Sequence, residues 1–252
     1  MKLTEAQYAL IKDALPRQRG NVRMSNLQIL NAILYVAENG CKWRALPEHF
    51  GNWNTIYVRM NRWAKSGTLA KVFDVLQRQQ IISIKIEAVS LDSTIVKVHP
   101  DGTGALKKPG PQSIGKSKGG WTTKIHMVAA TARCAIIFSL SPGNDGDAPA
   151  GRKLLSSWEK KQNSCHVIMD RAYEGNETQA LVRSFGYTPV VPPNPRRVTP
   201  WEYDRELYKK RNEIERLFRR LKGFRRVATR YDKLDVVFAA FIYFALIVDA
   251  LR

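Results

Sequence analysis

The hydrophobic and polar positions of the first 80 residues follow a helical period. Two capping boxes, Thr4 with Gln7 and Ser25 with Gln28, indicate helix starts. In such a box the hydroxyl accepts a hydrogen bond from a free backbone N–H and the glutamine side chain reaches back. After the second box, apolar residues recur on one face until an Asn-Gly pair, which is typical of a helix end. We therefore expect this segment to form a small all-helical domain.

A second amphipathic helix is predicted over residues 54–65. Ile56, Met60 and Trp63 share one face, which we expect to be buried. Basic residues spaced three apart follow another face: Arg59, Arg62 and Lys65. Such a helix is typical of a helix-turn-helix unit, whose second helix lies in the major groove of DNA. A plain helical domain with a basic face is the alternative. We predict that residues 1–80 are a helix-turn-helix-like DNA-binding domain.

From about residue 85 the pattern changes to strands. Strands are predicted over 85–91, 122–130, 134–140, 166–169 and 188–191, and helices over 147–162, 176–185, 202–221 and from 235 onward. A loop rich in Gly, Pro and Lys is expected over 97–120. Hairpin strands followed by strand–helix alternation favour an α/β fold in which helices flank a mixed sheet. We assign residues 85–252 to this second domain and place the boundary near residues 78–85.

Two segments bear on the cellular setting. The apolar run 236–248 has 13 residues, whereas a membrane-spanning helix needs about 20, so we interpret it as a buried helix. Residues 4–16 are amphipathic and charged, unlike a signal peptide. Three cysteines without C-x-x-C spacing fit a reducing compartment. These features predict a cytoplasmic protein with no membrane partner.

The charge of the chain narrows the class of partner. It has 41 Lys and Arg against 22 Asp and Glu, a net charge of +19, and residues 196–230 alone hold 13 basic and 5 acidic side chains. Such an excess favours a polyanionic partner, with nucleic acid ahead of an anionic membrane. A solvated surface is the alternative, although the charge exceeds what solubility requires. Lysines of residues 97–124 are expected to neutralise DNA phosphates: Lys107, Lys108, Lys116, Lys118 and Lys124.

Two aspartates each follow a predicted strand. Asp92 comes after 85–91 and Asp170 comes after 166–169. If these strands are neighbours, both carboxylates lie at one sheet edge and could share a Mg²⁺ ion, which prefers oxygen ligands. Phosphodiester chemistry commonly uses two such ions about 3.5–4 Å apart. An aspartate at a strand end is also a common turn cap, so neither residue identifies a site alone.

A third acid lies on the predicted helix 202–221. Tyr208, Arg211, Glu215 and Lys222 fall on one helical stripe because their spacings are three, four and seven residues. The alternative is a solvated face with an Arg211–Glu215 pair. Glu213 is a rival acid, but it points about 160° away from Glu215 around the helix. The pattern therefore favours Glu215.

These motifs resemble those of bacterial insertion-sequence transposases. Tyr208-x2-Arg211-x3-Glu215-x6-Lys222 matches their tyrosine–arginine–glutamate–lysine signature, and residues 91–94 (Leu-Asp-Ser-Thr) and 169–173 (Met-Asp-Arg-Ala-Tyr) resemble their first and second acid motifs. Residues 115–126 and 41–47 resemble segments of the insertion-sequence-five family. The acid motifs occur in order, 78 and 45 residues apart, and the resemblance covers nearly the whole chain.

The resemblance implies an RNase H-like fold, a DDE triad and two Mg²⁺ ions, for which Mn²⁺ is expected to substitute. It assigns Asp92, Asp170 and Glu215 as catalytic metal ligands, and it places Tyr208, Arg211 and Lys222 near the DNA end. The expected activity is cleavage of element ends and joining of the 3′-OH to target DNA, by a homodimer on double-stranded DNA. The alternatives are a metal-dependent nuclease without strand transfer and an inactive DNA-binding regulator.

Overall fold

The computed structural model describes residues 2–20, 22–83, 86–104, 110–158 and 165–252. Its helices are α1 (Glu5–Ala9), α2 (Asn26–Asn39), α3 (Trp53–Lys65), α4 (Thr68–Ser83), α5 (Asp147–Ser157), α6 (Asn176–Ser184), α7 (Arg205–Tyr208), α8 (Asn212–Lys222), α9 (Arg225–Ala228) and α10 (Asp235–Ala250). Its strands are β1 (Ala88–Val98), β2 (Gly115–Ser117), β3 (Gly120–Thr131), β4 (Cys134–Pro142), β5 (His166–Met169), β6 (Thr188–Val190) and β7 (Thr229–Arg230). The chain forms two compact units.

The first unit comprises Met1–Gln79, Val98–Gln112 and Arg220–Arg252. The two predicted capping boxes are present at the starts of α1 and α2, and α2 ends at Gly40 in the left-handed conformation. α3 buries Ile56, Met60 and Trp63 as expected. The apolar helix α10 packs against α3 and α9 inside this unit. None of the described helices combines the length and apolar character needed to cross a membrane.

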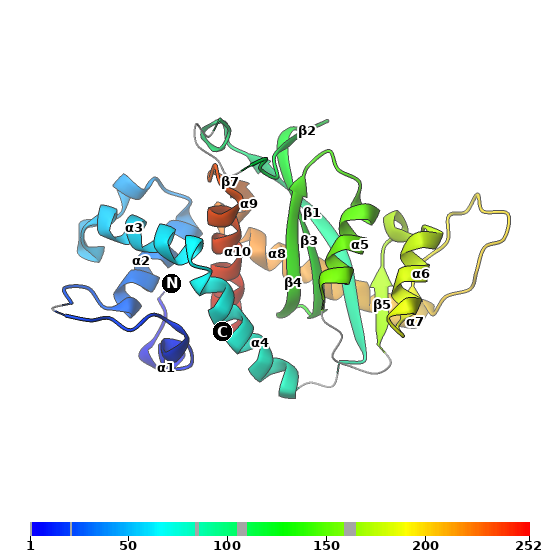
Figure 1. The fold of residues 1–252 in the computed structure, drawn as a ribbon, viewed down its shortest axis with the longest axis horizontal. Coiled ribbons are helices and arrows are strands. Elements are labelled where there is room, and N and C mark those ends of the chain that lie inside the picture. The colour runs from blue at the N-terminus through cyan, green and yellow to red at the C-terminus, as the bar shows by residue number, and fades with distance from the viewer. Residues whose placement is uncertain (1, 21, 84–85, 105–109, 159–164) are drawn as a thin grey trace. The chain divides into compact units, whose positions relative to one another are not determined.

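The second unit comprises Gln80–Lys97 and Ser113–Arg219 and contains the mixed sheet. Its strand order is β4-β3-β1-β5-β6, with β2 beside the start of β3. The pairs β3–β4 and β1–β3 are antiparallel, whereas β1–β5 and β5–β6 are parallel. Figure 1 shows α5 and α6 beside these strands. This mixed sheet with flanking helices confirms the predicted RNase H-like α/β fold.

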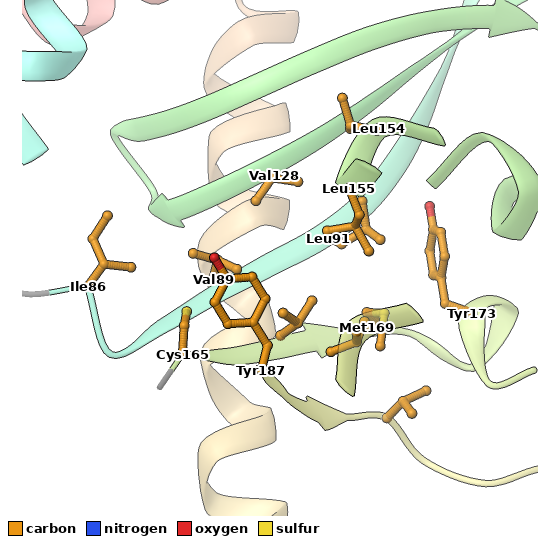
Figure 2. Packing of buried hydrophobic residues seen from close by; sticks show 13 residues of the cluster. Ile86, Val89, Leu91, Val128, Leu154, Leu155, Cys165, Met169, Tyr173 and Tyr187 are labelled. Carbon is orange, nitrogen blue, oxygen red and sulfur yellow. The ribbon is translucent and has the colours of Figure 1, made fainter. Parts of the chain in front are cut away.

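The core of the second unit lies between the sheet and α5. Leu91 and Met169, from neighbouring strands, pack with Leu154, Leu155 and Tyr173 (Figure 2). Gly151 of α5 makes the approach close, because a Cβ atom there would lie 2.5 Å from Cε1 of Tyr173 and 3.2 Å from a methyl group of Leu91. The helix therefore contacts the two segments that carry Asp92 and Asp170.

Four predicted boundaries are wrong. β1 does not end at Asp92 but continues to Val98, because β3 is long enough to pair with it along residues 90–97. The loop expected over 97–120 contains the short strand β2. The helix expected over 202–221 begins at Arg205 and is interrupted by a 3₁₀ turn at Lys209–Arg211. The helix predicted to 162 ends at Ser157, and residues 159–162 of that prediction lie outside the described residues.

The two units do not follow one cut along the chain. The change from the first to the second unit at residues 79–80 falls within the predicted boundary region. Residues 98–112 and 220–252, however, group with the N-terminal helices rather than with the sheet. The physical reason is burial: α10 is apolar on nearly all sides, and Phe238, Phe241 and Phe244 are fully buried within the first unit. The predicted span 85–252 therefore contains parts of both units.

Candidate active site

Asp92 lies within β1, and Asp170 directly follows the neighbouring strand β5. β1 and β5 pair in parallel with Leu91 opposite Met169, so the next residue of each chain segment is an aspartate. Asp170 also caps the following 3₁₀ turn, since its Oδ1 accepts a hydrogen bond from the N–H of Ala172 at 2.6 Å. The turn-cap interpretation and the expected adjacency are thus both correct for Asp170.

Arg211 joins the third acid to this pair. Its Nη1 lies 3.2 Å from Oδ2 of Asp92, and its Nη2 donates to Oε1 of Glu215. Its guanidinium carbon lies 5.9 Å from the centre of the Tyr208 ring. Residues 119 positions apart in the sequence therefore meet, and three members of the predicted helical stripe lie together beside Asp92.

The rival acid Glu213 is engaged elsewhere. Its Oε2 accepts a hydrogen bond from the backbone N–H of Ala132 at 2.9 Å, and its Oε1 pairs with Arg216 at 2.9 Å. These contacts hold α8 to the turn between β3 and β4. They agree with the helical geometry that favours Glu215 as the acid facing Asp92.

The electrostatics of Asp92 reflect an acidic cluster. The pKa of Asp92 is raised to about 6, chiefly by burial and also by the charges of Asp170 and Glu215. The backbone N–H of Ser93 and the guanidinium of Arg211 oppose this rise of the pKa. Three carboxylates within electrostatic reach destabilise one another's charge, which a cation would relieve.

The donor set suits a hard divalent cation because all three side chains offer carboxylate oxygens. As the side chains stand, no group of three or more His, Cys, Asp or Glu residues within the described parts of the chain is close enough to hold one ion. Arg211 instead bridges Asp92 and Glu215 with its single positive charge. The carboxylates therefore fit a metal chemically but need side-chain rearrangement to bind it.

The basic residues predicted to bind DNA fall into two groups. Arg62 and Lys65 on α3, Lys116 and Lys118 in the hairpin of β2 and β3, and Lys222 at the end of α8 are exposed. Arg59 is half-buried, and its Nη1 lies 3.3 Å from Oδ1 of Asn26. Lys107 and Lys108 lie outside the described residues.

The prediction that Lys124 contacts DNA is corrected by the structure. Lys124 is only 8 % exposed, and its Nζ lies 3.0 Å from Oδ1 of Asp147 and donates to the carbonyl of Asp145 at 2.7 Å. β3 is a central strand, so both of its faces are covered and its alternating side chains are buried on each. Lys124 therefore contacts groups inside the second unit, namely Asp147 and the carbonyl of Asp145.

The sequence did not reveal the residues that support Asp92. The N–H of Ser93 donates to Oδ1 of Asp92 at 2.7 Å, and its Oγ donates to Oδ1 of Asp147 at 2.7 Å. Burial chiefly raises the pKa of Tyr173, and the charges of Asp147 and Asp92 act in the same direction. An acid in the first turn of a predicted helix was the available signal, but its partner lies 54 residues away.

This arrangement belongs to the transposase class. Residues 84–248 match the family model "Transposase DDE domain", and residues 3–73 match "Putative transposase of IS4/5 family". Because the first match covers more than half of the chain, the protein belongs to the DDE transposase family, and it is an insertion-sequence member of it.

Individual relatives agree with this assignment. The chain is 34 % identical over 132 residues to the "Putative transposase for insertion sequence element IS6501" of Brucella ovis, covering 52 % of this chain and 99 % of the relative. It is 32 % identical over 111 residues to the uncharacterized protein y4sN of Sinorhizobium fredii, covering 43 % and 86 %.

Solved structures resemble the chain only distantly. A piggyBac transposase synaptic complex with hairpin DNA has a TM-score of 0.42 at 12 % identity, and a Mos1 mariner paired end complex with Mn has 0.32 at 11 %. The first covers 76 % of this chain and the second 98 %. The chain spans about half of the piggyBac chain (47 %) and 83 % of the Mos1 chain.

Proposed function

We propose that this transposase cleaves the ends of an insertion sequence and joins the freed 3′-OH to target DNA. The observation that carries the proposal is the convergence of Asp92, Asp170 and Glu215 from two adjacent strands and one helix. Convergent carboxylates from separate elements are what two-metal phosphodiester transfer requires. Membership of the transposase family supports DNA as the substrate.

In this proposal the three carboxylates hold two divalent cations, Mg²⁺ in the cell with Mn²⁺ as a substitute. Bound there, the cations would supply neutralisation of phosphate charge and activation of the attacking oxygen. The first step is attack of water on the scissile phosphorus, which forms one P–O bond and breaks the bond to the 3′ oxygen. In the second step that 3′-OH attacks a target phosphodiester, again exchanging one P–O bond for another.

The side chains around the acids would position DNA. The two Nη atoms of Arg211 already contact two carboxylates, Asp92 and Glu215. A DNA phosphate also offers two oxygens, which the same guanidinium could bind in a bidentate manner. Lys222, seven residues after Glu215 on α8, would act as a point charge on the backbone. Tyr208, beside Arg211, would contact the DNA end. These three roles rest on the resemblance of the motif and on the clustering of Tyr208 and Arg211.

Exposed basic residues would supply affinity for duplex DNA. In the first unit these are Arg62 and Lys65 on α3, with half-buried Arg59 beside them. In the second unit they are Lys116 and Lys118. Because joining two element ends uses two active sites, we propose a homodimer on DNA, a cytoplasmic event in a bacterial cell.

The decisive experiment is a strand-transfer assay. Purified protein is mixed with a labelled duplex carrying the ends that flank its gene, a target plasmid, and either Mg²⁺ or EDTA. We expect joined product with Mg²⁺ alone, its loss in Glu215→Gln, and its retention in the matched control Glu213→Gln.

Three other results would contradict the proposal or a part of it. Cutting without joining would assign a nuclease that uses the same acids. Binding without chemistry in any divalent metal would assign a regulator. Equal loss in both glutamate variants would reject the choice of Glu215.

A further inference from the structure

A partly buried polar chain connects Asp92 to the start of α5. Oδ1 of Asp147 accepts from Oγ of Ser93 at 2.7 Å and lies 3.0 Å from Nζ of Lys124. The N–H of Ser93 in turn donates to Oδ1 of Asp92 at 2.7 Å. The chain therefore runs Lys124, Asp147, Ser93, Asp92, and all four residues belong to the second unit.

The alternation of β1 explains why this chain lies behind the acid. Leu91 and Ser93 point to the face covered by α5, where Leu91 packs in the core and Ser93 meets Asp147. Asp92 points to the opposite face, where Arg211 contacts it. Asp147 therefore supports the backbone that presents Asp92 without sharing the space in front of it.

The burial of Lys124 makes Asp147 well fixed. A cation that is only 8 % exposed needs a partner, and Lys124 pairs with Asp147 and also donates to the carbonyl of Asp145 at 2.7 Å. Oδ1 of Asp147 thus accepts a hydrogen bond from the Ser93 hydroxyl and forms an ion pair with Lys124. Because two partners contact this oxygen, the position of the Asp147 carboxylate is restrained more strongly than by either partner alone.

The same helix also contacts the segment of the second acid. Gly151, one turn after Asp147, lies against Tyr173, which follows Asp170 in the 3₁₀ turn. α5 thus contacts both acid-bearing segments, one through hydrogen bonds and one through close packing. A helix fixed at both points restrains the spacing between Asp92 and Asp170.

We propose that Ser93, Asp147 and Lys124 are positioning residues that hold Asp92 in the orientation needed to bind a divalent cation. This inference rests on the proposed metal-dependent function and adds residues that the acid motifs do not include. Partners behind metal ligands typically change metal affinity by about 10–100-fold when they are removed. None of the three is assigned a contact with the metal or with DNA.

Mn²⁺ binding to the full chain tests the proposal, with free Mn²⁺ measured by electron paramagnetic resonance at a temperature where every variant is folded. We expect Ser93→Ala and Asp147→Asn each to raise the Kd for Mn²⁺ by about tenfold or more. Ser93→Thr keeps the hydroxyl and should bind like the wild type. Glu177→Gln is the matched control, because it removes the other acid paired with α5, through Arg152 at 2.8 Å.

The possible outcomes distinguish failure of the positioning role from failure of the proposed metal site. Loss of binding in Asp92→Asn, with Kd within about twofold of the wild type in Ser93→Ala and Asp147→Asn, would overturn the positioning role alone. Mn²⁺ binding that is unchanged in Asp92→Asn would overturn the metal site itself. If Asp147→Asn does not fold, the comparison of Ser93→Ala with Ser93→Thr still tests the positioning role, because these changes leave the Lys124–Asp147 ion pair in place.

Discussion

Both units contain arginine–carboxylate pairs, but the pairs differ in their balance of positive and negative charge. In the first unit two arginines each have their own acid: Arg220 binds Asp249 through Nε at 2.9 Å and through Nη2 at 2.5 Å, and Arg226 pairs with Asp232 at 3.1 Å. In the second unit the single guanidinium of Arg211 serves both Asp92 and Glu215, with Asp170 adding further negative charge.

This difference in charge balance distinguishes charges that stabilise the fold from charges that we propose to act in function. A buried pair with matched charges is costly to break, because removing one partner leaves the other uncompensated. A cluster with more acids than bases is strained electrostatically and gains from an added cation. The balance of charges within each cluster, rather than burial alone, distinguishes the cluster that we propose to be the active site.

The largest expected effect is on activity. Asp92→Asn or Asp170→Asn should lower strand-transfer activity more than about a thousandfold, since each removes a proposed metal ligand from a unit that acts together. Gel quantification of joined product under the conditions above measures this. Glu213→Gln should stay within a few-fold of the wild type. Activity of Asp92→Asn above one tenth of the wild-type level would remove the contrast between the two clusters.

The next effect is on the stability of the first unit. Arg226→Met should lower the free energy of unfolding by about 3–5 kcal/mol, because it leaves Asp232 buried without its guanidinium partner. Urea denaturation followed by circular dichroism measures this change. The exposed pair Lys209–Glu206 provides the control, and Lys209→Ala should cost less than about 1 kcal/mol. Equal effects in the two variants would contradict the structural role of the buried pair.

A smaller effect of opposite sign is expected at the acid cluster. The pKa of Asp92 is raised from 3.8 to about 6, so its ionisation in the folded state costs stability as pH rises between these values. In EDTA, Asp92→Asn should therefore stabilise the protein by about 1–3 kcal/mol above pH 6, and the gain should shrink as pH falls toward 4. Thermal unfolding at pH 4.5 and pH 8 measures it. A gain that grows at the lower pH would contradict the raised pKa.

The smallest effect concerns the hairpin. Lys116→Ala and Lys118→Ala should each weaken duplex binding similarly for all sequences and lower the magnitude of the salt slope by about one. Fluorescence anisotropy at several salt concentrations measures the slope. Lys124→Met removes an equal charge from a buried position and should leave the slope unchanged. A reduced slope in Lys124→Met would show that Lys124 contacts DNA despite its burial in the structure.

The sequence predicted local features well and distant contacts poorly. Helical angles correctly predicted that Glu215 and Glu213 point to different sides of the helix, because this depends only on residues two positions apart. The extension of β1 past Asp92 was missed because the polar residues Asp92, Ser93 and Thr94 follow Leu91, whereas pairing with β3 decides the length of the strand. The Ser93–Asp147 hydrogen bond was also missed, since nothing local in either segment encodes it.

The division into units depended on the same kind of long-range information. The apolar run of α10 predicted a buried helix correctly, but its partner could not be read from hydrophobicity alone. Packing with α3 and α9 places it in the first unit, although it follows the acid motifs in the chain. The order of segments in a sequence is thus a poor guide to which core they share.

Gly151 places a limit on how this protein can vary. Alanine in place of glycine normally favours a helix by up to about 1 kcal/mol. Here the added methyl group would press on Tyr173 at 2.5 Å and on Leu91 at 3.2 Å. A single added carbon atom would thus push on the segments that carry Asp92 and Asp170, without altering any charge. The gain in helix stability that alanine would bring is therefore opposed at this position by the packing of α5 against Tyr173 and Leu91.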